Sequence, residues 1–155
     1  MNSANPRLAY RQAAVEAATP LGLVVILYDL AIEDFRKAIA AIGAGDIEER
    51  TAALQHALSV LEQLHGRLDF EKGGEAAQQL DRFYSMVRGK ILEAQIKCSA
   101  AVLEEVMGLM SDLRGAWKQV EQNSAPAAPA MTVNNSALLA PNPQSVEASS
   151  NTWSA

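Results

Sequence analysis

The 155-residue chain is poor in the residues from which most catalytic sites are built. It has one cysteine, Cys98, and only two histidines, His56 and His65. A single cysteine rules out a disulfide within the chain and fits a reducing compartment. Aromatic residues are 5% of the sequence, and 9 glycines and 6 prolines are few beside its many Ala, Leu and Glu residues. This balance favours a helical protein over a β-sheet protein.

The chain also lacks positive charge. Its net charge is -5 and no Lys/Arg-rich cluster offsets this locally, which argues against nucleic-acid binding and against attachment to anionic membranes. The longest apolar run, Leu21–Ile32, is interrupted by Asp29 and is shorter than the roughly 20 residues that a membrane-spanning helix needs. The first residues lack the pattern of a signal peptide. We therefore expect a cytoplasmic protein without stable membrane insertion.

Helical periodicity and end signals divide the chain. Thr19-Pro20 is a strong helix start, Gly43 and Gly45 are typical of a helix end, and Ser99 is a plausible cap for the last helix. Asp46 followed by Glu49 resembles a capping box, and a turn is predicted over 69–74. The expected helices cover approximately residues 20–42, 47–68, 75–97 and 100–122.

These spacings predict an all-α, antiparallel up-down four-helix bundle. The predicted organisation is an N-terminal arm (1–18), the bundle (19–121) and a disordered, low-complexity tail (122–155). For the arm, a short helix and an extended segment both remain open. The tail contains one charged residue and two apolar islands, Ala137–Leu139 and Trp153. These islands either have no specific role or fold back onto the bundle and compete with a partner.

The helix at 20–42 is apolar on two faces, which is more than a bundle core requires. One stripe is Val24, Leu27, Ala31, Phe35, Ala38 and Ile42, and the other is Leu21, Val25, Tyr28, Ile32, Phe35 and Ile39. Surplus apolar residues on the later helices are Phe83, Met86, Leu92, Ile96, Val102, Met107 and Leu109. They either thicken the core or support a homodimer, or they bind amphipathic helices of another chain.

Motifs for catalysis and metal binding are largely missing. A two-metal bundle site needs two Glu-x-x-His motifs, but only Glu62 and His65 match, because Ala53 stands where His56 would need a carboxylate. There is no phosphate-binding loop, and Cys98 has no histidine near it in this topology to act as a base. We predict no metal, no cofactor and no enzymatic activity.

Several short motifs, in order, resemble flagellar secretion chaperones of the FliS family. They are Tyr10, Ala18-Thr19-Pro20, Leu27-Tyr28-Asp29, Leu68-Asp69 with Glu71-Lys72-Gly73-Gly74-Glu75, Tyr84, and Leu113-Arg114-Gly115-Ala116-Trp117. The resemblance covers residues 10–120. The chain departs from the family pattern at Leu21-Gly22, where a charged pair is usual, and at Leu30, where glycine is usual.

The resemblance implies a chaperone without catalytic activity. Its partners would be the disordered C-terminal segment of flagellin, which it keeps from polymerising early, and the flagellar type III export apparatus. It also implies that Tyr10 belongs to a lid over an apolar site that the client later occupies. The predicted client-binding residues are Tyr10, Leu21, Val25, Tyr28, Asp29 and Ile32. The alternative is a structural bundle that forms a weak homodimer through the second stripe and has no flagellin client.

Overall fold

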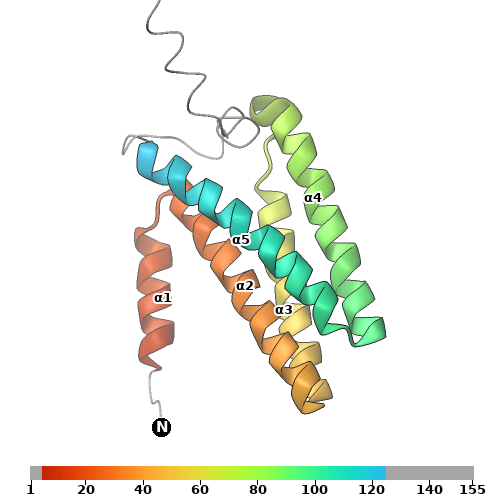
Figure 1. Cartoon of the computed structure of the whole chain (residues 1–155). Helices are drawn as coiled ribbons and strands as arrows, with labels where there is room; N and C mark the ends of the chain where they lie inside the picture. The colour runs from red at the N-terminus through yellow and green to blue at the C-terminus, as the bar shows by residue number, and fades with distance from the viewer. Residues whose placement is uncertain (1–4, 125–155) are drawn as a thin grey trace, which may run out of the picture.

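The computed structural model describes residues 5–124, and these residues form five helices (Figure 1). The helices are α1 (Pro6–Ala17), α2 (Pro20–Ala44), α3 (Ile47–Gly66), α4 (Phe70–Lys97) and α5 (Ala100–Asn123). No strand occurs among the described residues. The prediction of an all-α protein is therefore confirmed.

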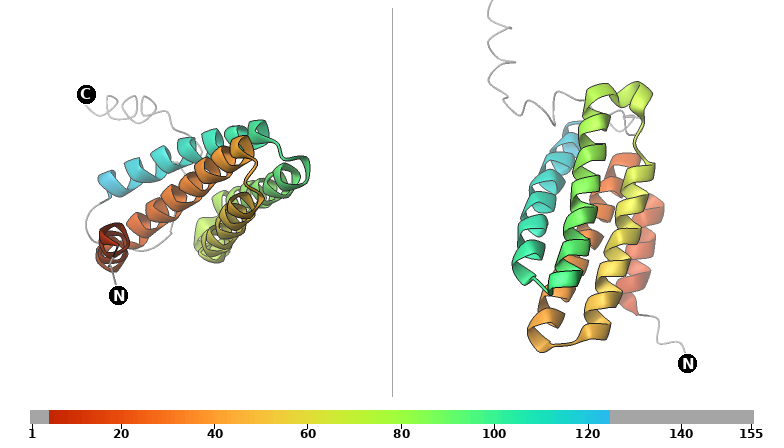
Figure 2. Two further views of the ribbon diagram at one scale, coloured as in Figure 1. Left: turned by 90° about the horizontal axis from the view of Figure 1, so that it is seen from below. Right: turned by 90° about the vertical axis from the view of Figure 1, so that its right-hand side faces the viewer.

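Helices α2 to α5 form the four-helix bundle. α2 packs against α3 and α5, and α4 packs against the same two helices from the opposite corner. Consecutive helices run antiparallel, and α1 stands outside the bundle, beside α2 and away from α4 (Figures 1 and 2). α2 approaches α3 and α5 more closely than α4 does. Among the described residues, α2 is thus the most closely packed of the four bundle helices.

Three of the predicted helix starts are confirmed by side-chain caps. The Thr19 hydroxyl accepts a hydrogen bond from the Gly22 amide at 3.0 Å, and the Asp46 carboxylate accepts one from the Glu49 amide at 3.0 Å. Ser99 accepts one from the Val102 amide at 3.3 Å. Each cap satisfies an amide that has no partner within its helix, which fixes where the helix begins.

Several predicted boundaries differ from the structure, and α3 ends at Gly66 rather than Leu68. α2 continues two residues past Ile42 and ends where Gly45 adopts the left-handed conformation, with φ 69°. The turn predicted over 69–74 is wrong, because Asp69 caps a helical turn that begins at Phe70 and joins the rest of α4. The chain kinks within α4 at Gly74, with φ 52° and ψ -127°, a conformation open only to glycine.

The N-terminal arm, left open between two conformations, is a helix. Asn5 caps α1 by accepting a hydrogen bond from the Arg7 amide at 3.1 Å, and Pro6 occupies the first turn. Two extended residues, Ala18 and Thr19, connect α1 to α2. At the other end α5 continues to Asn123. The predicted tail and its apolar islands lie outside the described residues.

The core lies between α2, α3, α4 and α5. Its largest fully buried side chains are Trp117, Tyr28, Tyr84, Phe35, Leu54, Leu61, Leu64, Ile91, Leu103, Met110, Val24 and Val60. The first predicted stripe of α2 is buried from Val24 to Ala38, and its last member, Ile42, is half-buried against the core. This core holds α2 in place and so positions the surface described next.

Candidate functional site

The second apolar face of α2 lies inside the bundle. Its four predicted site residues are Leu21, Val25, Tyr28 and Ile32, with exposed fractions of 5%, 7%, 0% and 5%. They belong to the common core with residues of α4 and α5. The sequence showed that this face needed a cover, and the bundle itself provides it.

Tyr28 lies at the centre of this buried face. Its hydroxyl is 2.8 Å from the hydroxyl of Tyr84 on α4, and the two ring centroids are 6.4 Å apart. Burial raises the pKa of Tyr28 to about 12, an effect that the hydrogen bond to Tyr84 offsets only in part. Burial also raises the pKa of Tyr84 well above its ordinary value. Both tyrosines are therefore neutral hydrogen-bonding groups of the core.

Asp29 lies at the edge of the same face and joins α2 to α5. Its carboxylate accepts hydrogen bonds from Arg114 Nε at 2.5 Å and from Arg114 Nη2 at 3.3 Å. The pair is partly exposed, with 49% of the Asp29 side chain accessible. The hydrogen bond to Asp29 raises the pKa of Arg114. This two-point contact fixes the relative position of the two helices.

Helix α1 is attached to α2 through charged groups. Arg11 forms an ion pair with Glu33, which also lies 3.8 Å from Lys37. The large apolar side chains of α1 are left in solvent: Leu8 is 62% exposed, Tyr10 77% and Val15 41%. Tyr10, predicted to cover an apolar site, does not bury its ring in this arrangement.

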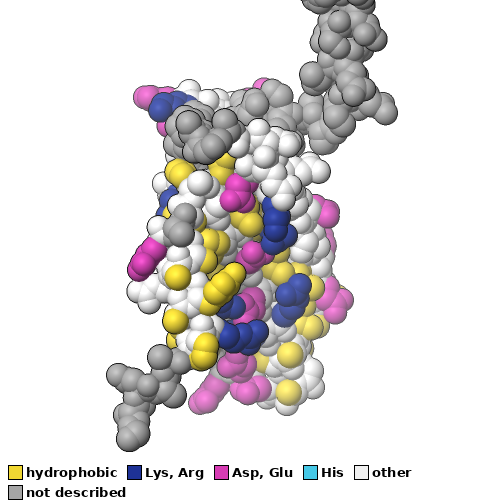
Figure 3. Space-filling model, turned by 90° about the vertical axis from the view of Figure 1, so that its left-hand side faces the viewer, with side chains coloured by type: hydrophobic (Ala, Val, Ile, Leu, Met, Phe, Trp, Pro, Cys, Tyr) yellow, Lys and Arg dark blue, Asp and Glu magenta, His cyan; other side chains and the backbone are white. Residues whose placement is uncertain are grey.

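Beneath α1 runs a third apolar stripe of α2. Ile26, Leu30 and Glu33 follow one another at helical spacing, so the ion pair of Glu33 with α1 places this stripe on the side that faces α1. Leu23, Ile26 and Leu30 are each half-buried, and we call these three residues the α2 ridge. Figure 3 shows this side of the molecule, where apolar side chains alternate with charged ones.

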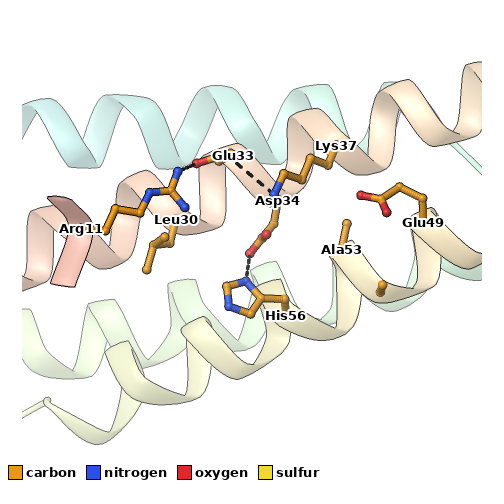
Figure 4. Close-up of a pocket in the computed structure, with 9 residues that line it drawn as sticks. Arg11, Leu30, Glu33, Asp34, Lys37, Glu49, Ala53 and His56 are labelled. Carbon is orange, nitrogen blue, oxygen red and sulfur yellow. Dashed lines mark hydrogen bonds and ion pairs between the residues drawn. The ribbon is translucent and has the colours of Figure 1, made fainter. Parts of the chain in front are cut away.

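A hollow lies on each side of the contact between α1 and α2. One, of about 290 Å³, lies towards α3 and is lined by Arg11, Leu30, Glu33, Asp34, Lys37, Glu49, Ala52, Ala53 and His56 (Figure 4). The other, of about 600 Å³, lies towards α5 and is lined by Arg7, Asp29, Ile32, Glu33, Arg36, Ser111 and Arg114. α1 thus leaves unfilled space along both of its edges.

Comparison with known proteins places the chain in a family. A family model described as "Flagellar protein FliS" matches residues 2–124. The chain is 33% identical over 130 residues to the flagellar secretion chaperone FliS of Salmonella typhimurium, covering 81% of this chain and 96% of that protein. The chain belongs to the FliS family of flagellar secretion chaperones. The Bacillus subtilis chaperone is 32% identical, with 77% of this chain and 88% of that protein covered.

Membership of the FliS family agrees with the predicted absence of catalysis, since this is a family of chaperones rather than enzymes. His65 pairs with Asp81 of α4, and Glu62 lies 3.9 Å from Arg88. In residues 5–124 no group of three His, Cys, Asp or Glu side chains is arranged to hold a metal ion. Within the same residues, no helix has the length and hydropathy to cross a bilayer.

The motifs by which the sequence resembles the FliS family meet in space. Tyr28 and Asp29, neighbours on α2, contact Tyr84 of α4 and Arg114 of α5 respectively. Trp117, one helical turn after Arg114 and fully buried, lies near Tyr28. The motifs on these three helices thus tie the bundle together. The α2 ridge was missed, although its signal, apolar residues at Leu23, Ile26 and Leu30, is visible in the sequence.

The hollow towards α3 contains a buried carboxylate. Asp34 Oδ2 is 2.6 Å from His56 Nδ1, and only 7% of the Asp34 side chain is exposed, against 56% for His56 (Figure 4). Burial raises the pKa of Asp34, and the hydrogen bond and charge of His56 lower it by less. Ionised Asp34 therefore costs the folded state free energy relative to the unfolded chain.

Asp34→Asn should make the protein more stable than the wild type at neutral pH. The pKa of Asp34 is higher in the folded than in the unfolded state. Its protonation therefore contributes to the stability of the folded state, and this contribution is complete at pH values below the pKa of the unfolded state. It is lost as pH rises through the folded pKa. The advantage of the variant in unfolding free energy should hence be smallest near pH 3, below the ordinary range of aspartate, and grow towards pH 7.

Urea unfolding across this pH range measures the effect. Asp112→Asn removes the same charge from an exposed position on α5 and serves as the control for net charge. A stability difference between wild type and Asp34→Asn that is independent of pH, or that matches the control, would contradict the effect of burial on Asp34.

Proposed function

We propose that this protein is a cytoplasmic chaperone that binds the C-terminal segment of flagellin on the α2 ridge after α1 has moved away. The observation that carries the proposal is the position of α1. It lies beside a half-buried apolar stripe of α2, yet its own apolar side chains remain in solvent and its attachment uses a partly exposed ion pair. Membership of the FliS family of flagellar secretion chaperones supports a client that is exported to the flagellum.

The attachment of α1 is weak enough for a client to displace it. Arg11 and Glu33 are 40% and 32% exposed, and exposed ion pairs typically contribute about 0.2–1 kcal/mol. Ala18 and Thr19 separate α1 from α2 by two extended residues, where rotation breaks no helical hydrogen bond of either helix. The binding free energy of a client is therefore reduced only by the small free energy with which α1 is attached to α2.

The predicted site residues take different parts in this proposal. Asp29 is accessible and would contact the client directly, whereas Tyr10, which is also accessible, would move away with α1. Ile32 is buried, but it lines the hollow beside Arg7 of α1, so departure of α1 would increase its exposure. Leu21, Val25 and Tyr28 support the surface from below. An amphipathic helix of flagellin would place its apolar face on Leu23, Ile26 and Leu30.

Occupying the C-terminal segment of flagellin would keep that segment from taking part in premature polymerisation. It would also present flagellin to the flagellar type III export apparatus in an unassembled form. The lid keeps the apolar ridge covered while no client is bound, because uncovered apolar patches favour aggregation. In this proposal α1 as a whole, including Tyr10, is the lid.

The experiment is a binding assay with two forms of flagellin. The full-length protein should be retained by the immobilised chaperone, and flagellin without its C-terminal segment should not. Equal retention of both forms, or of neither, would contradict the proposal. If neither is retained and light scattering shows a dimer at all concentrations, the alternative of a structural homodimer is favoured instead.

A further inference from the structure

A second apolar surface lies across the molecule, where α4 meets α5. Lys90 of α4 lies 3.9 Å from Glu105 of α5, which sets the antiparallel register of the two helices. One turn before Lys90 is Met86 and one turn after Glu105 is Leu109, so these two residues lie on neighbouring turns at the same level. Both side chains are 38% exposed.

The next turn continues this surface. Phe83 of α4 and Leu113 of α5 follow in the same register, and both are half-buried against the core. We call Phe83, Met86, Leu109 and Leu113 the α4–α5 strip. The strip shares no residue with the α2 ridge. Met86 and Leu109, at its more exposed end, would be stabilised most by being covered with apolar groups.

The sequence beyond α5 contains a segment suited to the strip. Residues 125–155 carry a single charge, Glu147, and their apolar residues include the run Ala137-Leu138-Leu139-Ala140. The family model ends at residue 124. The Salmonella relative is matched over 96% of its length by only 81% of this chain, so it has no room for a comparable extension. Residues 125–155 therefore lie outside the region that this chain shares with the family.

The length of chain before Leu138 suits the distance that it must cover. Leu109 lies fifteen residues before Ser124, which is about 22 Å along the helix. Leu138 follows Ser124 by fourteen residues, and a random-coil linker of fourteen residues would have a root-mean-square span of about 20 Å. A tether whose span matches the separation gives the highest effective concentration, of millimolar order.

We propose that the segment 137–140 packs on the α4–α5 strip of its own chain and shields it. Leu138 and Leu139 would cover Met86 and Leu109, with no charge brought into the apolar contact. The contact closes a surface on which copies of the protein could otherwise associate. It does not depend on the α2 ridge and would stand if the proposed client site were wrong.

Cys98, the sole and exposed cysteine, allows a direct test in the full-length protein. It precedes Leu109 by eleven residues, or about 16 Å along α5. A nitroxide attached to Cys98 should broaden the amide NMR signals of residues 137–140 in the intact chain. The broadening should be lost in Met86→Asp/Leu109→Asp, whose other signals report whether the bundle remains folded.

The matched control is Leu92→Asp/Ile96→Asp, which introduces the same charge on α4 at positions that are 47% and 82% exposed. It should leave the broadening unchanged. Absence of broadening in the wild type, or its loss only in the control, would overturn the proposal. Mixing isotope-labelled chains without nitroxide and unlabelled chains with it should give no broadening. Broadening in this mixture would assign the contact to a second copy and would also overturn it.

Discussion

Replacing Trp117 by alanine is expected to lower the free energy of unfolding by about 3–5 kcal/mol, the usual range for truncating a large buried aromatic side chain. Trp117 is the largest of the fully buried side chains, with 0% exposed. Its removal leaves a cavity between α5 and the tyrosines of α2 and α4. A loss of this size is a large part of the 5–15 kcal/mol typical of a domain.

The cavity would open at the point where three helices are held together. Tyr28 and Tyr84 share a hydrogen bond at 2.8 Å beside Trp117, and the Asp29–Arg114 pair lies one helical turn away along α5. The indole Nε1 of Trp117 is buried and has no hydrogen-bond partner among the described residues. The contribution of this side chain is hence packing rather than hydrogen bonding, and Trp117→Phe should retain much of it.

Chemical denaturation of the two variants beside the wild type measures this difference. Trp117→Phe is the matched control, because it keeps an aromatic ring in the cavity and should lose much less stability than Trp117→Ala. If both variants lost the same amount, or if Trp117→Ala lost less than about 1 kcal/mol, the description of Trp117 as a packed core residue would be wrong.

The helices could be predicted because their signals are local. Thr19, Asp46 and Ser99 each bond an amide within three residues, so the capping pattern in the sequence is sufficient to place these ends. The kink at Gly74 could not be placed in this way. Gly73-Gly74 is equally typical of a turn, and the choice is made by burial of Gly73 and Ala76 against the bundle, which is a tertiary effect.

The site was less predictable because sequence periodicity shows which faces are apolar without showing what covers them. The sequence predicted an outer surface for Leu21, Val25, Tyr28 and Ile32, whereas they are buried in the common core of the bundle. The apolar residues of α2 cover several faces of the helix, and these faces are directed towards different neighbours: α3 and α5 within the bundle, and α1 outside it. Only the position of Arg11 beside Glu33 identifies Leu23, Ile26 and Leu30 as the stripe under α1.

Ile26→Asp is expected to weaken binding of the flagellin C-terminal segment at least about 30-fold, which corresponds to the 2 kcal/mol or more of an interface hot spot. Ile26 is central in the α2 ridge, so a carboxylate there would be desolvated without a partner by any apolar helix that binds. Titration calorimetry with a peptide of that segment measures the change. Ile96→Asp, equal in chemistry but 82% exposed on α4, should bind like the wild type.

The same substitution also acts on the lid, and the sign of the result separates the two effects. A carboxylate at position 26 makes the ridge less apolar and weakens its contact with α1, which alone would raise the affinity for a client. Loss of the client's own contact lowers the affinity. A net loss therefore shows that the client uses the ridge itself. Unchanged or tighter binding by a folded Ile26→Asp protein would show that the client binds elsewhere and that α1 covers no client site.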